Sequence, residues 1–174
     1  MSAIDYDLKK IRGVALDVDG VLSPSTIPLG SDGMPRRMVN IKDGYALQLA
    51  VKRGVKIAII TGGTSDAIVL RYRALGIADI YQGAGHKLPV LEEWMQKEGL
   101  TADEVAEYRS EVRGVGYVRY VWCRCWRSED DREVLATARY ISRFTGGYGC
   151  VRDLLEQLLK AQGHWMADDK AFGW

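Results

Sequence analysis

Two aspartates, Asp17 and Asp19, are the residues whose type and spacing most clearly suggest chemistry. They follow residues 11–16, an apolar segment interrupted only by Arg12 and Gly13, which predicts a buried strand. Aspartates at a strand end are often ordinary turn residues. The carboxyl end of a strand in a parallel sheet, however, opens onto the ligand crevice, and a carboxylate pair there can bind Mg²⁺ through oxygen. The pair is therefore a candidate catalytic and metal site.

A second group of candidate residues follows the later apolar segments. Thr61, Gly62 and Gly63 come directly after residues 55–60, and Lys87 follows the next predicted strand. Backbone amides ahead of a helix favour an anion, and Lys87 would add a positive point charge. Taken singly, these residues have simpler interpretations as a helix cap, a turn and a solvated side chain. Because each stands at the end of a successive strand, together with the aspartates they predict a site for a phosphoryl group beside Mg²⁺.

Alternating strand-like and helix-like segments predict an α/β fold with a parallel sheet that positions these groups. Strands are expected over residues 11–16, 55–60, 77–81 and 115–122, helices over residues 43–53, 64–76, 88–97 and 151–161, a capping-box turn at residues 101–104, and a helix followed by a strand over residues 128–143. Residues 23–41 hold three of the four prolines and a turn at residues 30–33 flanked by apolar residues. This segment is expected to form a small β-hairpin flap over the end of the first strand.

Length and composition bound the class of protein. The 174 residues suggest one domain, expected over residues 1–162 and followed by a loosely held tail over residues 163–174. A net charge of +1 gives no overall field that would draw nucleic acid or a membrane surface, and no apolar run approaches the roughly 20 residues that span a bilayer. Three cysteines form no disulfide framework, which favours reduced thiols and a cytoplasmic protein. Cys123 and Cys125 lack the further ligands of a zinc site.

Six short segments carry a specific resemblance. They are DVDGV at residues 17–21, NIKDGY at 40–45, IAIITG at 57–62, YQG at 81–83, HKL at 86–88 and GGYGCVR at 146–152. With them the chain resembles the haloacid dehalogenase superfamily of phosphohydrolases, and within it the small capless 3-deoxy-D-manno-octulosonate 8-phosphate phosphatase family. The matching parts cover residues 8–106 and 136–162. The resemblance implies a Rossmann-like three-layer sandwich with a mostly parallel sheet.

The resemblance also implies a mechanism. Asp17 would attack phosphorus to form an aspartyl-phosphate. Asp19 would protonate the leaving alcohol and then take a proton from the attacking water. Thr61, Gly62 and Lys87 would hold the phosphoryl oxygens, and Mg²⁺ would be bound through Asp17 and Asp19.

The implied substrate is a small phosphorylated sugar acid, 3-deoxy-D-manno-octulosonate 8-phosphate, on the route to lipopolysaccharide. A nine-carbon keto-deoxy sugar-acid phosphate is the nearest alternative, and a catalytically impaired oligomeric phosphate-binding scaffold is the non-enzymatic one. The resemblance to capless members also implies a homotetramer, in which the flaps join subunits and the Gly-Gly-x-Gly segment reaches a neighbouring active site. On that pattern Arg152 is a candidate contact for the substrate carboxylate. An equally supported interpretation is that Arg152 is a solvent-exposed residue on the last helix.

The chain departs from the family pattern at two places. Family members commonly carry an arginine after Thr-Gly, where this chain has Gly63. The larger departure follows residues 103–106, where a short apolar strand and Gly-Asp-Asp should supply the remaining Mg²⁺ carboxylate. This chain instead reads EYRSEVRG at residues 107–114.

Three explanations of the second departure stay open. Compensating frame errors could have scrambled residues 107–135 without changing their number. Alternatively, Glu111 or the pair Asp130-Asp131 could supply the carboxylate from a rearranged loop, although the pair also resembles an acidic helix start. The third explanation is a true sequence that has lost catalytic power. Because arginines are poor occupants of a buried strand, this segment is expected to be the least well-packed part of the fold.

Overall fold

The computed structural model describes residues 4–109, 121–125 and 140–171. Its centre is a six-stranded sheet in which every neighbouring pair of strands is parallel. The strands are β1 (Gly13–Leu16), β2 (Lys56–Ile60), β3 (Asp79–Tyr81), β4 (Val105–Arg109), β5 (Val121–Cys125) and β6 (Tyr140–Ser142). Their order is β3-β2-β1-β4-β5-β6. The chain therefore builds outward from β1 in one direction and then in the other, which makes the β1–β4 junction the topological switch point where ligands of such sheets bind.

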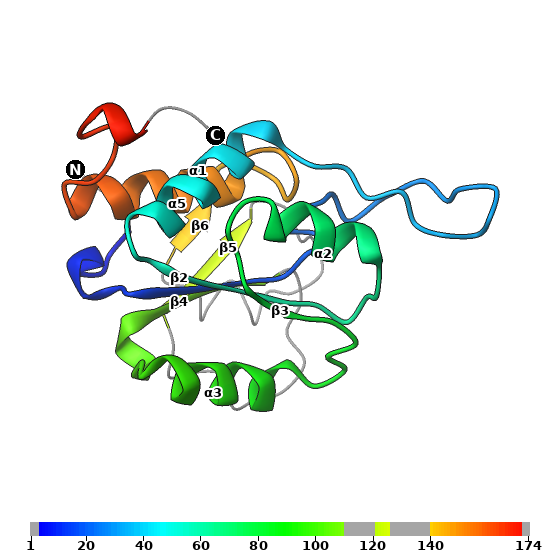
Figure 1. The fold of residues 1–174 in the computed structure, drawn as a ribbon, viewed down its shortest axis with the longest axis horizontal. Helices are drawn as coiled ribbons and strands as arrows, with labels where there is room; N and C mark the ends of the chain where they lie inside the picture. Colours follow the sequence, from blue (N-terminus) through cyan, green and yellow to red (C-terminus); the bar gives the residue numbers. More distant parts are fainter. Residues whose placement is uncertain (1–3, 110–120, 126–139, 172–174) are drawn as a thin grey trace.

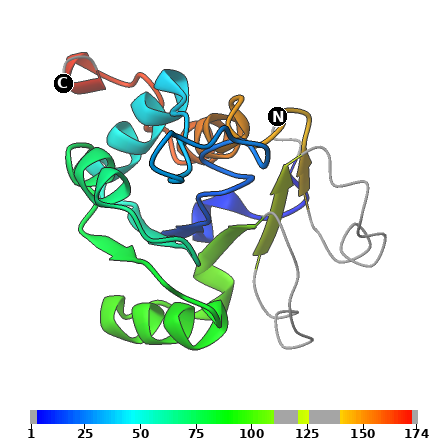
Figure 2. The same ribbon diagram turned by 90° about the vertical axis from the view of Figure 1, so that its right-hand side faces the viewer.

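Helices cover both faces of the sheet. They are α1 (Ile41–Lys52), α2 (Asp66–Arg73), α3 (Lys87–Glu98) and α5 (Cys150–Ala161), with short 3₁₀ turns η1 (Leu8–Lys10), η2 (Ala102–Glu104) and η4 (Asp169–Ala171). Figures 1 and 2 show α1, α2 and α5 on one face and α3 on the other. Each face buries its own apolar cluster against the sheet. The predicted three-layer α/β sandwich with a parallel sheet is confirmed.

Apolar periodicity explains α5. Its buried side chains recur every three or four residues and form one stripe against the sheet. They are Val151, Leu154, Leu155, Leu158 and Leu159. Burying each such side chain contributes about 1.5–3 kcal/mol, so this stripe anchors the helix next to α1, its principal helical neighbour.

Helix boundaries follow their caps. α1 begins at Ile41, two residues before the predicted Asp43, because the Asn40 side chain accepts hydrogen bonds from the amides of Lys42 and Asp43. The α2 helix begins at Asp66, slightly after the predicted start. The capping box predicted at residues 101–104 is present and ends in η2, directly before β4.

The second half of the chain differs more from the expected elements. The strand predicted over residues 115–122 is instead β5 at Val121–Cys125, where parallel pairing with β4 sets its position. The strand predicted near the end of residues 128–143 is present as β6. The helix predicted before it, and most of the segment expected to be poorly packed, lie outside the described residues.

Residues 23–41 form the predicted flap. An antiparallel bridge joins Leu29 and Pro35, and the amide of Gly33 donates to the Gly30 carbonyl to close the turn. Figure 1 shows this hairpin extending away from the sandwich. Several large apolar side chains in and beside it are exposed: Leu29, Met34, Met38, Val39 and Ile41.

The C-terminal segment differs from the loosely held tail that the sequence suggested. The Tyr45 hydroxyl donates to the Ala171 carbonyl at 3.0 Å, and Arg53 pairs with Asp168 at 2.7 Å. The Trp165 ring also packs edge-on against Tyr45, with 5.9 Å between centroids. Tyr45 of α1 and Arg53, the residue after its end, therefore hold the described part of the tail. No helix in the described ranges is long and apolar enough to cross a membrane.

Candidate active site

The predicted site residues meet at the carboxyl edge of the sheet. Asp17 directly follows β1, and its amide donates to the Tyr108 carbonyl of β4 at 3.1 Å. Thr61 directly follows β2, and its amide donates to the Tyr81 carbonyl of β3 at 2.9 Å. Both side chains are buried. Parallel pairing thus brings the ends of β1 and β2 together beside the topological switch point, as predicted from the sequence.

The buried Asp17 forms an ion pair with Lys87, whose side chain is only partly exposed. The Lys87 Nζ lies 2.5 Å from Asp17 Oδ2, and the Val18 amide donates to Asp17 Oδ1 at 2.7 Å. Lys87 is the first residue of α3, so the helix start places the ammonium against the end of β1. The Asp17 side chain is 5% exposed. These contacts fix the orientation of the carboxylate and place one positive charge beside it.

The Thr61-Gly62-Gly63 segment forms a tight turn before α2. The Gly63 amide donates to Thr61 Oγ1 at 3.3 Å, and the Ala84 amide donates to the Thr61 carbonyl at 3.0 Å. A Cβ built on Gly62 would meet nothing closer than the Ala84 carbonyl oxygen, at 3.9 Å. The turn is therefore open beside Gly62, which is compatible with the anion-binding role expected of this segment.

Asp19 is held by an arginine that the sequence analysis did not single out. Arg37 of the flap donates from Nε to Asp19 Oδ1 at 2.7 Å and from Nη2 to Oδ2 at 2.9 Å. This hydrogen bonding is the largest of the effects that raise the pKa of Arg37, with burial acting in the opposite direction. Gly63 lies beside the pair, since a Cβ there would be 2.6 Å from Arg37 Nη2. The missing side chain at Gly63 is what leaves room for the guanidinium.

Asp17 and Asp19 are the residues expected to bind Mg²⁺. Asp17 and Asp19 offer the hard oxygen donors that Mg²⁺ prefers, and Mg²⁺ is commonly held by one or two carboxylates together with substrate phosphate and water. The donor set therefore fits Mg²⁺. Across residues 4–109, 121–125 and 140–171, no group of three His, Cys, Asp or Glu side chains is placed to hold a metal ion.

Glu107 is the described acidic residue of the divergent segment that lies near Asp17. It is buried on β4, opposite Ala15 of β1, and lines the same small space as Asp17 and Lys87. No role for Glu107 was expected from the sequence. The two expected carboxylate sources, Glu111 and the pair at residues 130–131, lie outside the described residues.

Comparison with known proteins identifies the family. The chain is 32% identical over 155 residues to the 3-deoxy-D-manno-octulosonate 8-phosphate phosphatase KdsC of Escherichia coli strain K12, an alignment that covers 89% of this chain and 82% of that protein. The chain belongs to the 3-deoxy-D-manno-octulosonate 8-phosphate phosphatase family. No family model matches it.

Solved structures agree with this assignment. The 3-deoxy-D-manno-octulosonate 8-phosphate phosphatase of Moraxella catarrhalis, in complex with a magnesium ion, a phosphate ion and KDO, superposes with a TM-score of 0.82 at 32% identity over 89% of each chain. A probable YrbI-family phosphatase of Pseudomonas syringae gives a TM-score of 0.85 at 29% identity over 92% of each chain. The haloacid dehalogenase-like fold is therefore shared along most of this family member's length.

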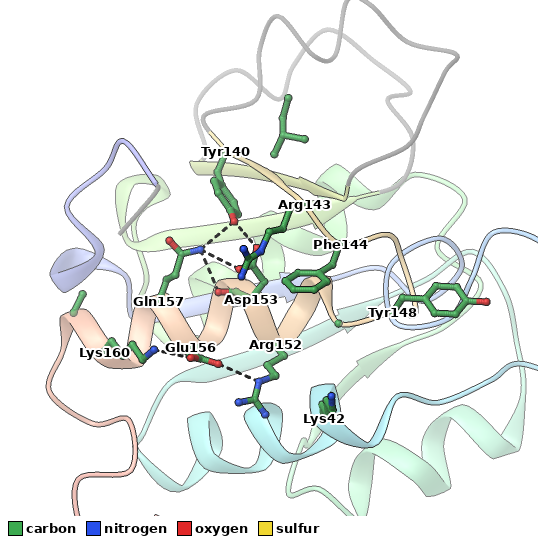
Figure 3. Close-up of a pocket in the computed structure, with 13 residues that line it drawn as sticks. Lys42, Tyr140, Arg143, Phe144, Tyr148, Arg152, Asp153, Glu156, Gln157 and Lys160 are labelled. Carbon is green, nitrogen blue, oxygen red and sulfur yellow. Dashed lines mark hydrogen bonds and ion pairs between the residues drawn. The ribbon is translucent and has the colours of Figure 1, made fainter. Parts of the chain in front are cut away.

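Arg152, the expected contact for a substrate carboxylate, lies elsewhere within this chain. Its Nε is 3.0 Å from Glu156, and its guanidinium lies 5.1 Å from the Trp165 ring centre. It lines a cavity of about 920 Å³ between α5 and the end of β6, drawn in Figure 3. The residues expected at the phosphate site do not line this cavity. One subunit therefore does not bring Arg152 to the phosphate site.

The polar side chains of this cavity largely pair with one another. Asp153 accepts hydrogen bonds from the hydroxyls of Tyr140 and Ser142, and Gln157 donates to the Tyr140 oxygen at 3.1 Å. Burial, followed by the Asp153 hydrogen bond, raises the pKa of Tyr140 to about 12. Figure 3 shows this group on the wall formed by α5 and β6. The arrangement ties the edge strand to the last helix.

Asp43 connects α1 to the start of α5. It is buried, and its Oδ1 accepts the Arg152 amide at 2.7 Å. Burial raises the pKa of Asp43 to about 6, although hydrogen bonds from the Arg152 and Gly149 backbones act in the opposite direction. Asp43 belongs to a segment that carries the family resemblance, but no function was expected of it from the sequence.

Proposed function

We propose that this chain is a Mg²⁺-dependent phosphatase that hydrolyses 3-deoxy-D-manno-octulosonate 8-phosphate to the free sugar acid and phosphate. The observation that carries the proposal is the ion pair between the buried Asp17 and Lys87, beside the buried Thr61 at the switch point of the sheet. Membership of the family supports the substrate, and the magnesium, phosphate and KDO bound by the M. catarrhalis relative support the cofactor and the products.

Asp17 is the nucleophile in this proposal. One oxygen of its carboxylate attacks phosphorus, the bond from phosphorus to the sugar oxygen breaks, and an aspartyl-phosphate forms. The Val18 amide and Lys87 hold the carboxylate in one orientation before attack. Lys87 and the turn at Thr61-Gly62 then neutralise charge on the phosphoryl oxygens. Bound Mg²⁺ supplies further charge neutralisation at the phosphoryl group.

Asp19 carries the proton in both half-reactions. It donates a proton to the departing sugar oxygen, so that the sugar leaves as an alcohol. It then takes a proton from the water that attacks the aspartyl-phosphate, which releases phosphate and restores the Asp17 carboxylate. Its partly exposed side chain, 40% accessible, suits a group that must exchange protons with substrate and water.

The proposal extends to the oligomeric state, the pathway and the cellular location of the enzyme. The exposed apolar residues of the flap support a homotetramer in which flaps join subunits. In such a tetramer, Arg152 would contact the substrate carboxylate in a neighbouring subunit's site. A role in lipopolysaccharide synthesis follows from the proposed substrate, and the cytoplasmic location expected from the cysteines stays a prediction.

Two alternatives remain from the sequence. A nine-carbon keto-deoxy sugar-acid phosphate would use the same chemistry, because Asp17, Asp19 and Lys87 act only at the phosphate end. An impaired scaffold would keep the fold and bind phosphate without turnover. The divergent segment motivates the scaffold, because the fourth motif, which should supply the remaining carboxylate for Mg²⁺, is not recognisable in it.

The deciding experiment is an assay of phosphate release by this polypeptide with both sugar-acid phosphates, in Mg²⁺ and in chelator, with Asp17→Asn as the blank. We expect Mg²⁺-dependent turnover that prefers the eight-carbon substrate and disappears in the variant. Preference for the nine-carbon compound would select the alternative substrate. Folded protein with no turnover above the blank would contradict the phosphatase and select the scaffold.

A further inference from the structure

We propose that Arg37 is a substrate-positioning residue, supplied by the flap, which moves from Asp19 to the phosphate group when substrate binds. The inference rests on the proposed function, because it assigns a new residue to the same phosphate site. Arg37 lies outside the six short segments that carry the family resemblance, and its contacts alone point to this role.

The placement of Arg37 distinguishes it from the rest of the flap. Its side chain is 13% exposed, whereas that of the adjacent Arg36 is 57% exposed and pairs with Asp32 within the flap. Both nitrogens that Arg37 directs at Asp19 are within hydrogen-bond distance. The flap therefore sends one arginine inward to the site and leaves its neighbour outside.

Gly63 is the structural condition for this contact. A Cβ at this position would lie 2.6 Å from Arg37 Nη2 and 3.6 Å from Asp19 Oδ2. Gly63 has no positive φ, so its backbone does not itself require glycine. The lack of a side chain serves the approach of the guanidinium, which thereby reaches the turn proposed to hold the phosphoryl group.

The chemistry of the pair implies that it opens during the reaction. Both Asp19 oxygens accept hydrogen bonds from Arg37, whereas proton transfer needs an Asp19 oxygen directed at the leaving group. A phosphate monoester offers the planar guanidinium a stronger anionic partner with matching bidentate geometry. Binding of substrate at the Thr61-Gly62-Gly63 turn therefore draws Arg37 to the phosphate and frees Asp19 for the chemical step.

The first test measures binding without turnover. In the Asp17→Asn protein with Mg²⁺, affinity for inorganic phosphate and for 3-deoxy-D-manno-octulosonate 8-phosphate is measured by calorimetry, with and without Arg37→Met. We expect Arg37→Met to weaken both about ten- to a hundredfold, the usual effect of losing a charge-assisted contact. Arg37→Lys should recover part of the loss, and Arg36→Met should cause none. Equal affinities in the Arg37→Met and Arg36→Met proteins would overturn the inference.

A double-mutant cycle with Gly63→Ala separates positioning from flap stability. The added methyl group displaces Arg37, so Gly63→Ala alone should raise KM several-fold while leaving the flap sequence intact. In the Arg37→Met background the same substitution should have little further effect, because the two changes remove one contact. Additive effects on KM would count against the inference.

The two proposals fail in different ways. A wild-type protein without turnover, but with phosphate binding that depends on Arg37, would refute the phosphatase and support the role of Arg37. A wild-type protein with turnover and a KM unchanged by Arg37→Met would support the phosphatase and refute the role of Arg37. A folded protein that binds neither phosphate nor substrate would overturn the role of Arg37.

Discussion

The sheet has two halves, one formed by β3, β2 and β1 and the other by β4, β5 and β6. Both halves are parallel, yet they differ in how directly their sequences indicate this architecture. The first half carries the recognisable motifs at its strand ends. The second half departs from the family pattern from Glu107 of β4 onward, but β4 still pairs with β1, with Ala15 opposite Glu107 and Leu16 opposite Tyr108. The comparison shows that strand pairing with β1 can place a divergent segment even where its own sequence signal is weak.

The site divides along the same line. Its described candidate catalytic groups come from the first half and from the helix that follows β3. The second half contributes the Tyr108 carbonyl, which accepts the Asp17 amide, and the buried Glu107. Chemistry and support are therefore concentrated in different halves, and substitutions in each should have different consequences.

The largest expected effect lies in the first half. Asp17→Asn should lower kcat by about 10⁴-fold or more, because the amide cannot act as the nucleophile. Stopped phosphate-release assays with Mg²⁺ would measure this loss, and circular dichroism would verify the fold. Activity within tenfold of wild type would mean that the nucleophile is another residue.

Lys87→Met should be the most destabilising change at the site. Removing Lys87 takes the positive charge away from the buried Asp17 carboxylate, and breaking a buried ion pair in this way costs about 3–5 kcal/mol. Urea denaturation would measure the change in the free energy of unfolding. Lys97→Met is the matched control on α3, because Lys97 is exposed and pairs with Asp79 at the surface, and we expect little change from it. Equal effects of the two substitutions would show that the Asp17–Lys87 pair is not buried in solution.

Leu16→Ala and Tyr108→Ala compare the packing of the two halves directly. The residues are opposite one another on β1 and β4, and both are buried. Each truncation should cost about 2–5 kcal/mol of unfolding free energy if both halves are well packed. A much smaller loss for Tyr108→Ala would support the expectation that the divergent segment is the least well-packed part of the fold. Equal losses would argue against compensating frame errors as its origin.

The smallest effect concerns Asp43 and depends on pH. Because burial raises its pKa to about 6 in the folded protein, folding favours the protonated carboxyl group. This contribution to stability, up to about 3 kcal/mol, is fully present below about pH 4 and is lost as pH rises through about 6. Urea titrations between pH 4 and 8 should show a flatter profile for Asp43→Asn than for wild type. Parallel profiles would show that another group causes the dependence.

Local patterns were sufficient for much of the fold. The spacing of apolar residues in α5, the capping box before β4 and the turn of the flap each act over a few residues. The order of the site residues along the chain was also informative, because parallel strands put their carboxyl ends at one edge of the sheet. The position of β5 was predicted less well, since pairing with β4 rather than local propensity determines it.

The sequence by itself determined the elements of the first half, the grouping of Asp17, Thr61 and Lys87, and the family. Only the tertiary structure decided that Arg37 reaches Asp19, that Arg152 faces a separate cavity, and that α1 holds the tail. The physical reason is the range of the interactions. Caps, turns and amphipathic stripes depend on residues a few positions apart in the sequence. An ion pair between the flap and the site, or a docked terminus, depends instead on how elements far apart in the sequence pack together, which no local sequence pattern indicates.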